Sequence, residues 1–198
     1  MMDAPFNPNL IGGRVARDGE LPFSVFIQNC SASLVGPEVI LTAGHCRGNN
    51  ESVSFNFDGQ RREGRCRRHP QFTENRNDFL NNDFSLCVFS PRIDRVVFAD
   101  LSPVSVGSND RVTLQGFGQN RLGTLQVGEA RVDQINNKDI QVRSNVKLGG
   151  GDSGGGLLLG EPDLVNGPFQ IIGVNSRVET NGTTSFFNRV NLQRSQDF

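Results

Sequence analysis

The sequence contains no tryptophan and no tyrosine, so its 15 phenylalanines must supply the aromatic packing. Its 198 residues carry a net charge of only −1, and the chain lacks the basic field that attracts nucleic acid or an anionic membrane. No apolar run reaches the roughly 18 residues that a membrane-spanning helix needs. We therefore expect neither nucleic acid nor a membrane among its partners. The length allows one large or two small domains with a hydrophobic core.

The amino-terminal residues lack the features of a secretory signal peptide. The segment Met1-Met2-Asp3-Ala4-Pro5 has neither a charged n-region nor an apolar h-region. Either the protein stays inside the cell or its signal has been removed. Residues 1–10 are polar and broken by prolines, which predicts a flexible leader.

Cysteine and histidine are too few and too far apart for a zinc site of the usual spacing. The chain has four cysteines, none in a Cys-x-x-Cys pair, and two histidines. We therefore expect no metal and no other cofactor. An even number of widely spaced cysteines suits two disulfides in an oxidising compartment; the alternative is four buried free thiols. The first interpretation favours a secreted or periplasmic protein. The cysteines are Cys30, Cys46, Cys66 and Cys87.

Short apolar runs alternate with turn residues along most of the chain. Residues 23–27 and 53–57 are examples in the first half, and residues 111–115 and 185–190 are examples of the same pattern in the second half. No window shows a long helical period, and strands at this spacing indicate an all-β sandwich or barrel. Residues 90–110 show little alternation and predict a connection between two β units.

The most unusual stretch is residues 149–156, where six of eight residues are glycine and Ser153 lies among them. Glycine weakens helices and strands, but it suits tight turns that leave backbone N–H groups facing a ligand. Ser153 is then either an ordinary loop serine or a nucleophile beside an oxyanion site. A phosphate-binding loop is excluded by context, because no Lys-Ser/Thr follows and a β run comes next.

Two further residues could act with Ser153. His45 follows an apolar strand and precedes Cys46, and a disulfide from Cys46 to Cys30 would fix the backbone on which His45 lies. Asp83 comes directly before the apolar run at residues 84–89. A lone histidine or a strand-capping aspartate is by default structural. Together, however, the three could supply a nucleophile, a base and an orienting carboxylate.

Six short motifs in this order resemble those of the trypsin/chymotrypsin-like serine proteases over nearly the whole chain. The resemblance implies an all-β fold of two six-stranded antiparallel barrels with the active site in the cleft between them. The first barrel would span about residues 21–100 and the second about 111–190, within a protease domain at 11–198. The motifs are Ile11-Gly12-Gly13, Thr42-Ala43-Gly44-His45-Cys46, Asn82-Asp83-Phe84-Ser85-Leu86, Gly116-Phe117-Gly118, Gly151-Asp152-Ser153-Gly154-Gly155 and Asn188-Arg189-Val190.

The resemblance also implies a role for each candidate residue in a secreted endopeptidase that acts on protein or peptide substrates through an acyl-enzyme. Ser153 would attack the scissile carbonyl, His45 would move the proton and Asp83 would orient the imidazole. The N–H groups of Gly151 and Ser153 would form the oxyanion hole. Ser176 is similar to the family's serine near the triad aspartate, on the strand that binds the substrate backbone.

Activation in this family begins with cleavage ahead of the motif at Ile11. By resemblance, the freed Ile11 amine would pair with Asp152, because a buried acid needs such a partner. Residues 1–10 would then be an activation segment, and the chain would be a zymogen or an unprocessed form that requires an activating protease. The scissile bond, Leu10–Ile11, is not one that a protease cutting after Lys or Arg would cleave. We therefore predict that the chain does not activate itself in a trypsin-like manner.

The specificity pocket departs from the trypsin pattern. Lys147 stands where trypsin-like members have an aspartate, and Gly149 replaces a cysteine of the pocket wall. If Lys147 points into the pocket, it should favour acidic side chains over basic ones; otherwise it is a solvated lysine. We expect non-trypsin specificity in either case, with Lys147 and Ser176 assigned to the pocket.

The remaining two cysteines do not match a family disulfide that can be transferred directly. In this fold Cys66 and Cys87 would lie on neighbouring antiparallel strands, where a cross-strand bridge is geometrically allowed.

A monomer is expected. The competing hypothesis is a serine protease homologue that has no activity and acts as a protein-binding module.

Overall fold

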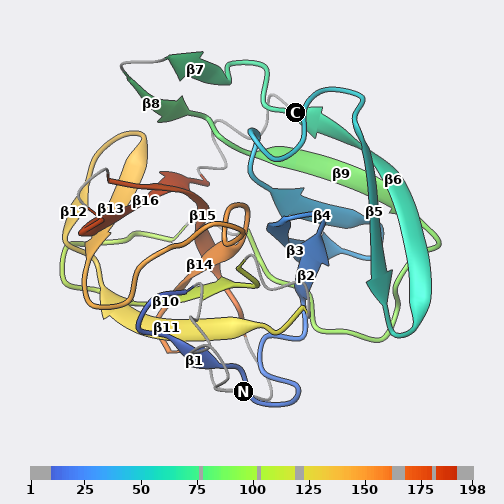
Figure 1. Ribbon diagram of the computed structural model, residues 1–198, viewed down its shortest axis with the longest axis horizontal. Helices are drawn as coiled ribbons and strands as arrows, with labels where there is room; N and C mark the ends of the chain where they lie inside the picture. The colour runs from blue at the N-terminus through green and yellow to red at the C-terminus, as the bar shows by residue number, and fades with distance from the viewer. Residues whose placement is uncertain are drawn as a thin grey trace, which may run out of the picture.

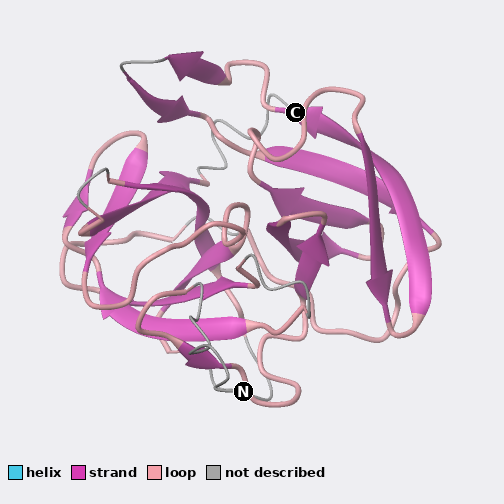
Figure 2. Cartoon of the chain, viewed as in Figure 1, coloured by secondary structure: helices cyan, strands magenta, loops and turns pink. Residues whose placement is uncertain are grey.

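The structure is a computed structural model that describes residues 10–75, 78–101, 104–118, 123–161, 168–179 and 182–190. Within these ranges it contains sixteen β-strands, and no helix is long or apolar enough to cross a membrane. Figure 2 shows only strands, loops and turns in the described part. The predicted leader lies outside the described residues, apart from Leu10.

The first half of the chain forms a six-stranded antiparallel sheet in the order β2-β3-β4-β9-β6-β5. Its edge strands β2 and β5 contact each other, which closes the sheet into a barrel (right-hand side of Figure 1). The strands are β2 (Ser24–Ile27), β3 (Cys30–Gly36), β4 (Val39–Thr42), β5 (Ser52–Phe57), β6 (Gln60–Arg68) and β9 (Ser85–Ser90).

The second half forms a curved sheet in the order β1-β11-β10-β14-β15-β16-β13-β12. The expected two-barrel, all-β fold is confirmed, but this sheet has eight strands because the two-residue strands β1 and β12 extend its edges. β1 is recruited because the segment after Ile11 runs along β11, where Arg14 pairs with Val127. The strands are β1 (Arg14–Val15), β10 (Arg111–Gly116), β11 (Gln126–Arg131), β12 (Gln134–Ile135), β13 (Asp139–Arg143), β14 (Gly156–Leu159), β15 (Ile171–Val178) and β16 (Thr184–Arg189).

A separate hairpin lies between β6 and β9 in the sequence, within the first half of the chain, and above the barrels in Figure 1. It consists of β7 (Thr73–Asn75) and β8 (Asp78–Asn81). Asp83 follows this hairpin directly and precedes β9, so the hairpin delivers the candidate acid to the junction of the barrels.

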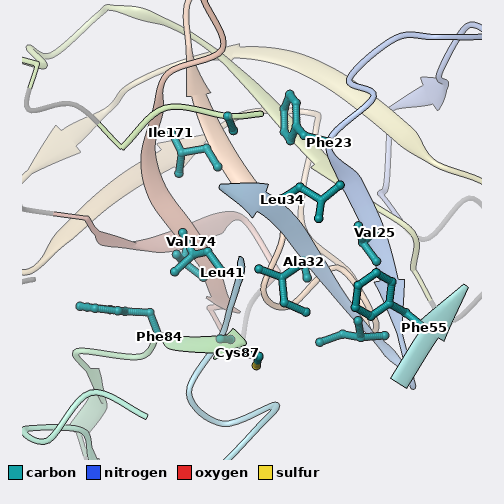
Figure 3. Close-up of a cluster of buried hydrophobic side chains, with 14 of the residues drawn as sticks. Phe23, Val25, Ala32, Leu34, Leu41, Phe55, Phe84, Cys87, Ile171 and Val174 are labelled. Atoms are coloured by element: carbon teal, nitrogen blue, oxygen red, sulfur yellow. The ribbon is translucent and has the colours of Figure 1, made fainter. Parts of the chain in front are cut away.

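The hydrophobic core is continuous across the barrel junction. Phe23 of the first barrel packs on Phe169, which precedes β15, with ring centroids 5.0 Å apart. Ile171 and Val174 of β15 belong to the same buried cluster as Leu34 (Figure 3). Burying one such side chain contributes about 1.5–3 kcal/mol, so these contacts fix the barrels relative to each other.

All four cysteines are in disulfides, so the alternative of four free thiols is wrong. The Cys30–Cys46 bridge ties the start of β3 to the residue that follows His45. The Cys66–Cys87 bridge joins register partners on β6 and β9. Both bridges therefore constrain segments that carry or adjoin the candidate site.

Candidate active site

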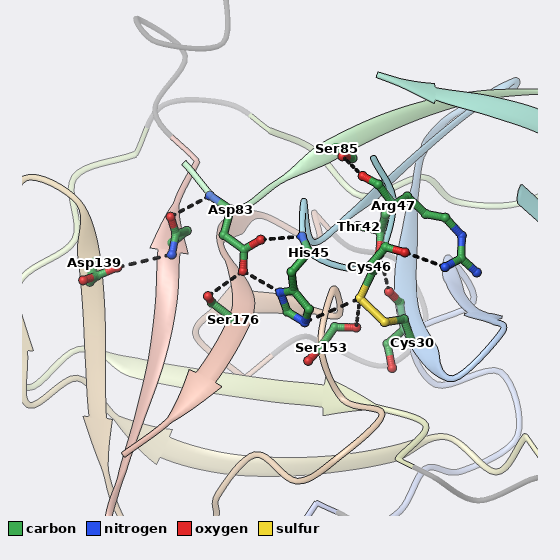
Figure 4. Close-up of polar contacts among 12 residues, drawn as sticks. Cys30, Thr42, His45, Cys46, Arg47, Asp83, Ser85, Asp139, Ser153 and Ser176 are labelled. Carbon is green, nitrogen blue, oxygen red and sulfur yellow. Dashed lines mark hydrogen bonds and ion pairs between the residues drawn. A yellow bond between two sulfur atoms is a disulfide. The ribbon is translucent and has the colours of Figure 1, made fainter. Parts of the chain in front are cut away.

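His45 and Asp83 lie together at the junction of the two barrels (Figure 4). The Nδ1 atom of His45 is 2.8 Å from Oδ2 of Asp83, and the backbone N–H of His45 donates to Oδ1 of the same carboxylate at 2.8 Å. The Asp83 side chain is fully buried, whereas that of His45 is 27% exposed. Because an ionised carboxylate only accepts hydrogen bonds, it assigns the proton to Nδ1 and leaves Nε2 as an acceptor.

The surroundings of His45 make its imidazole more basic. Burial lowers the pKa of His45, but the hydrogen bond and the negative charge of Asp83, with a contribution from Glu74, raise it. The net effect is a pKa above the usual histidine value. This is the direction that helps the ring to take a proton during a reaction.

Asp83 is held from its other side by the second barrel. The hydroxyl of Ser176 on β15 donates to Oδ2 of Asp83 at 2.6 Å, and the backbone N–H of Asp83 donates to Oδ1 of Asn188 on β16 at 2.8 Å. Ser176 therefore lies beside Asp83, as the resemblance implied, and its assignment to the specificity pocket stays a prediction. Asn188 begins the last of the six motifs, but its local sequence gives no sign of a role at the site.

The loop that carries Ser153 is docked on the first barrel. The N–H of Ser31 donates to the carbonyl of Ser153 at 2.8 Å, and the Ser31 hydroxyl donates to the carbonyl of Gly151 at 2.9 Å. Gly154 has φ +88°, and a Cβ there would lie 2.3 Å from the carbonyl oxygen of Ser31. Only glycine allows this approach, so its place in the motif has a physical cause.

The structure brings Ser153 close to His45 without joining their side chains. Among the described residues no hydrogen bond links the Ser153 hydroxyl to Nε2 of His45, and Nε2 lies 3.8 Å from Sγ of Cys46. The carbonyl of Ser153 lies 3.7 Å from the same sulfur. The hydrogen bond between a nucleophile and its base is often long in a free enzyme and tightens when substrate binds.

The backbone around Ser153 leaves donors for an anion. Gly151 adopts φ +90°. In the described part of the chain, the N–H groups of Gly151 and Ser153 have no hydrogen-bond acceptor, whereas Asp152 and Gly154 donate to the carbonyls of Gly149 and Asn175. Two free N–H groups in one glycine-rich turn are the kind of donors that an oxyanion hole requires, and this role stays a prediction.

Asp152 is fully buried, and no residue in the described part of the chain forms an ion pair with it. Its Oδ2 accepts the N–H of Gly149 at 2.8 Å and its Oδ1 accepts the N–H of Gly118 at 2.9 Å. Burial raises the pKa of Asp152 to about 6, although the two backbone hydrogen bonds act in the opposite direction. A cation placed beside a buried carboxyl in this state would strongly stabilise its ionised form.

The pairing of Ile11 with Asp152 is predicted only after cleavage ahead of Ile11, and the two residues do not interact in the uncleaved chain. The Ile11 side chain is exposed, and its backbone forms two hydrogen bonds with Lys147, at 3.0 and 2.9 Å. The physical reason is that the nitrogen of Ile11 is an uncharged amide in the intact chain and is already used in this bridge. Leu10 is the buried residue instead, and its N–H donates to Oε1 of Gln126 at 3.1 Å.

Lys147 is half-buried and makes no ion pair with a described residue. The next residue, Leu148, donates its N–H to the hydroxyl of Ser185 at 3.1 Å, which links this segment to β16.

The described residues contain one cluster of potential metal ligands, formed by Cys30, His45 and Cys46. Both sulfurs are joined in the disulfide. A disulfide offers no thiolate, which is the form of cysteine that binds zinc. The cluster therefore does not fit a metal.

Two barrels that meet at a histidine–aspartate pair, with a glycine-flanked serine beside them, define the class of double-barrel serine proteases. The family model described as Trypsin matches residues 10–196, and the chain accordingly belongs to the trypsin family of serine proteases. Over 103 residues it is 32% identical to cathepsin G of Homo sapiens. The match covers 43% of this chain and 39% of cathepsin G, so the chain spans about two-fifths of the length of that relative.

Proposed function

We propose that the chain is a secreted or periplasmic serine endopeptidase in which Ser153, His45 and Asp83 form the catalytic triad. The observation that carries the proposal is the His45–Asp83 pair, 2.8 Å apart on both of its hydrogen bonds, beside the free N–H groups of Gly151 and Ser153. The two disulfides favour an oxidising compartment; recovery of the protein only from the cytosol would contradict that part.

The proposed mechanism assigns each group one task. The Ser153 hydroxyl attacks the scissile carbonyl while Nε2 of His45 takes its proton, and Asp83 stabilises the imidazolium that forms. The N–H groups of Gly151 and Ser153 hold the oxyanion, each worth about a hundred- to a thousandfold in rate. The amine leaves with the proton from His45, and water then hydrolyses the acyl-enzyme by the same route.

The competing function is a protein-binding homologue without activity. A fluorophosphonate probe separates the two, because its phosphorus bonds covalently to an activated serine oxygen with loss of fluoride. We expect labelling of Ser153 in the processed protein and none in the Ser153→Ala variant. Absence of labelling in processed protein with native disulfides would remove the enzyme hypothesis.

Activation is proposed to require cleavage one residue earlier than the motif at Ile11 suggests. The family match begins at residue 10, and Leu10 is fully buried while Ile11 is 48% exposed. The amine that pairs with Asp152 would then belong to Leu10. We expect intact-mass analysis and N-terminal sequencing of the active protein to give Leu10 as its first residue.

The control for this prediction is the Ser153→Ala variant treated with the same activating protease. It should give the same terminus, because the bond after Asn9 is not a trypsin-like site and the chain does not cleave itself. A terminus at Ile11, or processing that is lost in Ser153→Ala, contradicts the proposal.

Substrate preference is proposed to follow the charge of Lys147. A half-buried lysine without an ion-pair partner repels basic side chains and attracts acidic ones. In a peptide library the processed enzyme should cut after acidic residues about a hundredfold better than after Lys or Arg. The Lys147→Asp variant should reverse the order. Cuts after Lys or Arg by the unaltered enzyme would show that Lys147 does not reach the substrate.

A further inference from the structure

A buried ion pair lies behind the candidate acid, on the side away from His45. Nη2 of Arg177 on β15 is 3.5 Å from Oδ2 of Asp139 on β13, and the two side chains are only 17% and 8% exposed. The guanidinium carbon of Arg177 also lies 4.2 Å from the ring centroid of Phe186. Burying two charges is expensive and often adds no stability. The position of this pair therefore calls for a role other than stabilising the fold.

The pair is connected to Asp83 through the amide of Asn188. Asn188 is the register partner of Asp139, and its Nδ2 donates to Oδ1 of Asp139 at 3.3 Å. Its Oδ1 accepts the backbone N–H of Asp83 at 2.8 Å. Figure 4 shows Asp139 and Asp83 on either side of the amide that joins them.

Asp139 decides which end of this amide faces Asp83. An amide has one accepting and one donating end, whereas an ionised carboxylate can only accept. The Asp139 carboxylate therefore takes the NH₂ end of Asn188, which leaves the oxygen for the N–H of Asp83. The reverse orientation would place NH₂ against N–H and break the hydrogen bond to the acid.

Arg177 opposes the effect of burial on Asp139, whose pKa is raised overall. Burial raises the pKa of Asp139 and the negative charge of Asp83 adds to this, whereas Arg177, and to a lesser extent Lys138, lower it. A β-bulge between Asn175 and Arg177 shifts the register of β15. It directs the Ser176 hydroxyl to the Asp83 carboxylate while Arg177 meets Asp139. The side chains of the adjacent residues Ser176 and Arg177 thus contact Asp83 and Asp139, the two ends of one network. Bulges near functional sites often redirect side chains in this way.

We propose that Arg177, Asp139 and Asn188 are positioning residues that hold Asp83 against His45, and that the balance of charge within the Arg177–Asp139 pair tunes the proton affinity of His45. The catalytic consequence of this network rests on the proposed function, whereas the contacts that form the network do not depend on it. The other charged groups that face His45 are Asp83, Glu74 and Arg68. These three groups are unchanged in the variants below, so a shift in the pKa of His45 reports on the Arg177–Asp139 pair.

The test is an NMR titration of the His45 ring in the intact protein. The sequence has only two histidines, so a His69→Gln variant assigns both ring signals. Asp139→Asn keeps an oxygen for Asn188 but leaves Arg177 unbalanced, and it should lower the pKa of His45 by about 0.5 unit. Arg177→Gln should raise that pKa by a similar amount. The double variant restores the balance and should return the pKa to within about 0.2 unit of the unaltered protein.

The matched control is Asp94→Asn, which breaks the exposed Arg92–Asp94 ion pair and should leave His45 unchanged. A purely structural role for the buried pair would change the unfolding temperature without moving the titration of His45 in opposite directions. Shifts of the same sign in both single variants, or no shift in any of them, overturn the proposal.

A kinetic arm separates positioning from charge. Asp139→Leu removes the group that orients Asn188, and it should lower kcat about tenfold with little change in KM, whereas Asp139→Asn should retain most of kcat. Equal losses in the two variants contradict the positioning role. The NMR arm needs no proteolysis, so a chain that fails fluorophosphonate labelling can still confirm or refute the network.

Discussion

Replacing Ser153 by alanine is expected to lower kcat on a peptide substrate by about a millionfold, and His45→Ala should cost nearly as much. The double variant should lose no more than either single one, because the hydroxyl and the imidazole act in one proton transfer. The measurement is kcat for the processed enzyme, its two single variants and the double variant.

The control is Ser108→Ala, which changes an exposed serine in the connection between the barrels and should leave kcat unaltered. Losses that add up in the double variant would mean that Ser153 and His45 act independently. A Ser153→Ala enzyme that keeps more than about one percent of kcat would remove Ser153 as the nucleophile.

The intact chain is expected to lose stability as the pH rises from about 4 to 7, because Asp152 is buried and no described residue pairs its carboxylate with a cation. Its folded-state pKa of about 6 lies above the unfolded value of 3.8, so the folded chain binds more protons in this window. The free energy of unfolding therefore falls with rising pH. A shift of roughly two pKa units corresponds to at most about 3 kcal/mol.

Urea denaturation of the intact protein and of Asp152→Asn at pH 4 and pH 7 measures this effect. Asparagine loses one acceptor, so the absolute stability of the variant is not the readout. The difference between the two proteins should change by up to about 3 kcal/mol across the window, in favour of the variant at pH 7. Asp58→Asn, an exposed change, should show no such difference. Parallel pH curves for all three proteins would show that Asp152 is not responsible.

Local sequence determined much of the site. His45, Asp83 and Ser153 each lie in a short motif whose neighbours have a physical function: Cys46 anchors the turn and Gly154 permits the approach to Ser31. The strand spacing determined the all-β class, and the family resemblance supplied the two barrels.

The activation residue shows where local sequence was insufficient. Leu10 and Ile11 are adjacent and both apolar, so either can be read as the residue that is buried. Consecutive residues of an extended segment face opposite sides, and a one-residue difference in register exchanges the buried and exposed sets. Only the bridge between Ile11 and Lys147 places Leu10 inside and Ile11 outside.

The sequence by itself predicted the fold class and the three residues proposed to act on substrate, because each depends on neighbours along the chain or on strand order. It left the state and pairing of the cysteines open, and the structure decided them. The tertiary structure decided which residues hold Asp83. Asp139, Arg177 and Asn188 come from three strands. No motif includes Asp139 or Arg177, and the motif that begins at Asn188 assigns it no role. Their roles arise from hydrogen bonds and an ion pair across β13, β15 and β16, and the bulge that aims Arg177 exists only once those strands are paired.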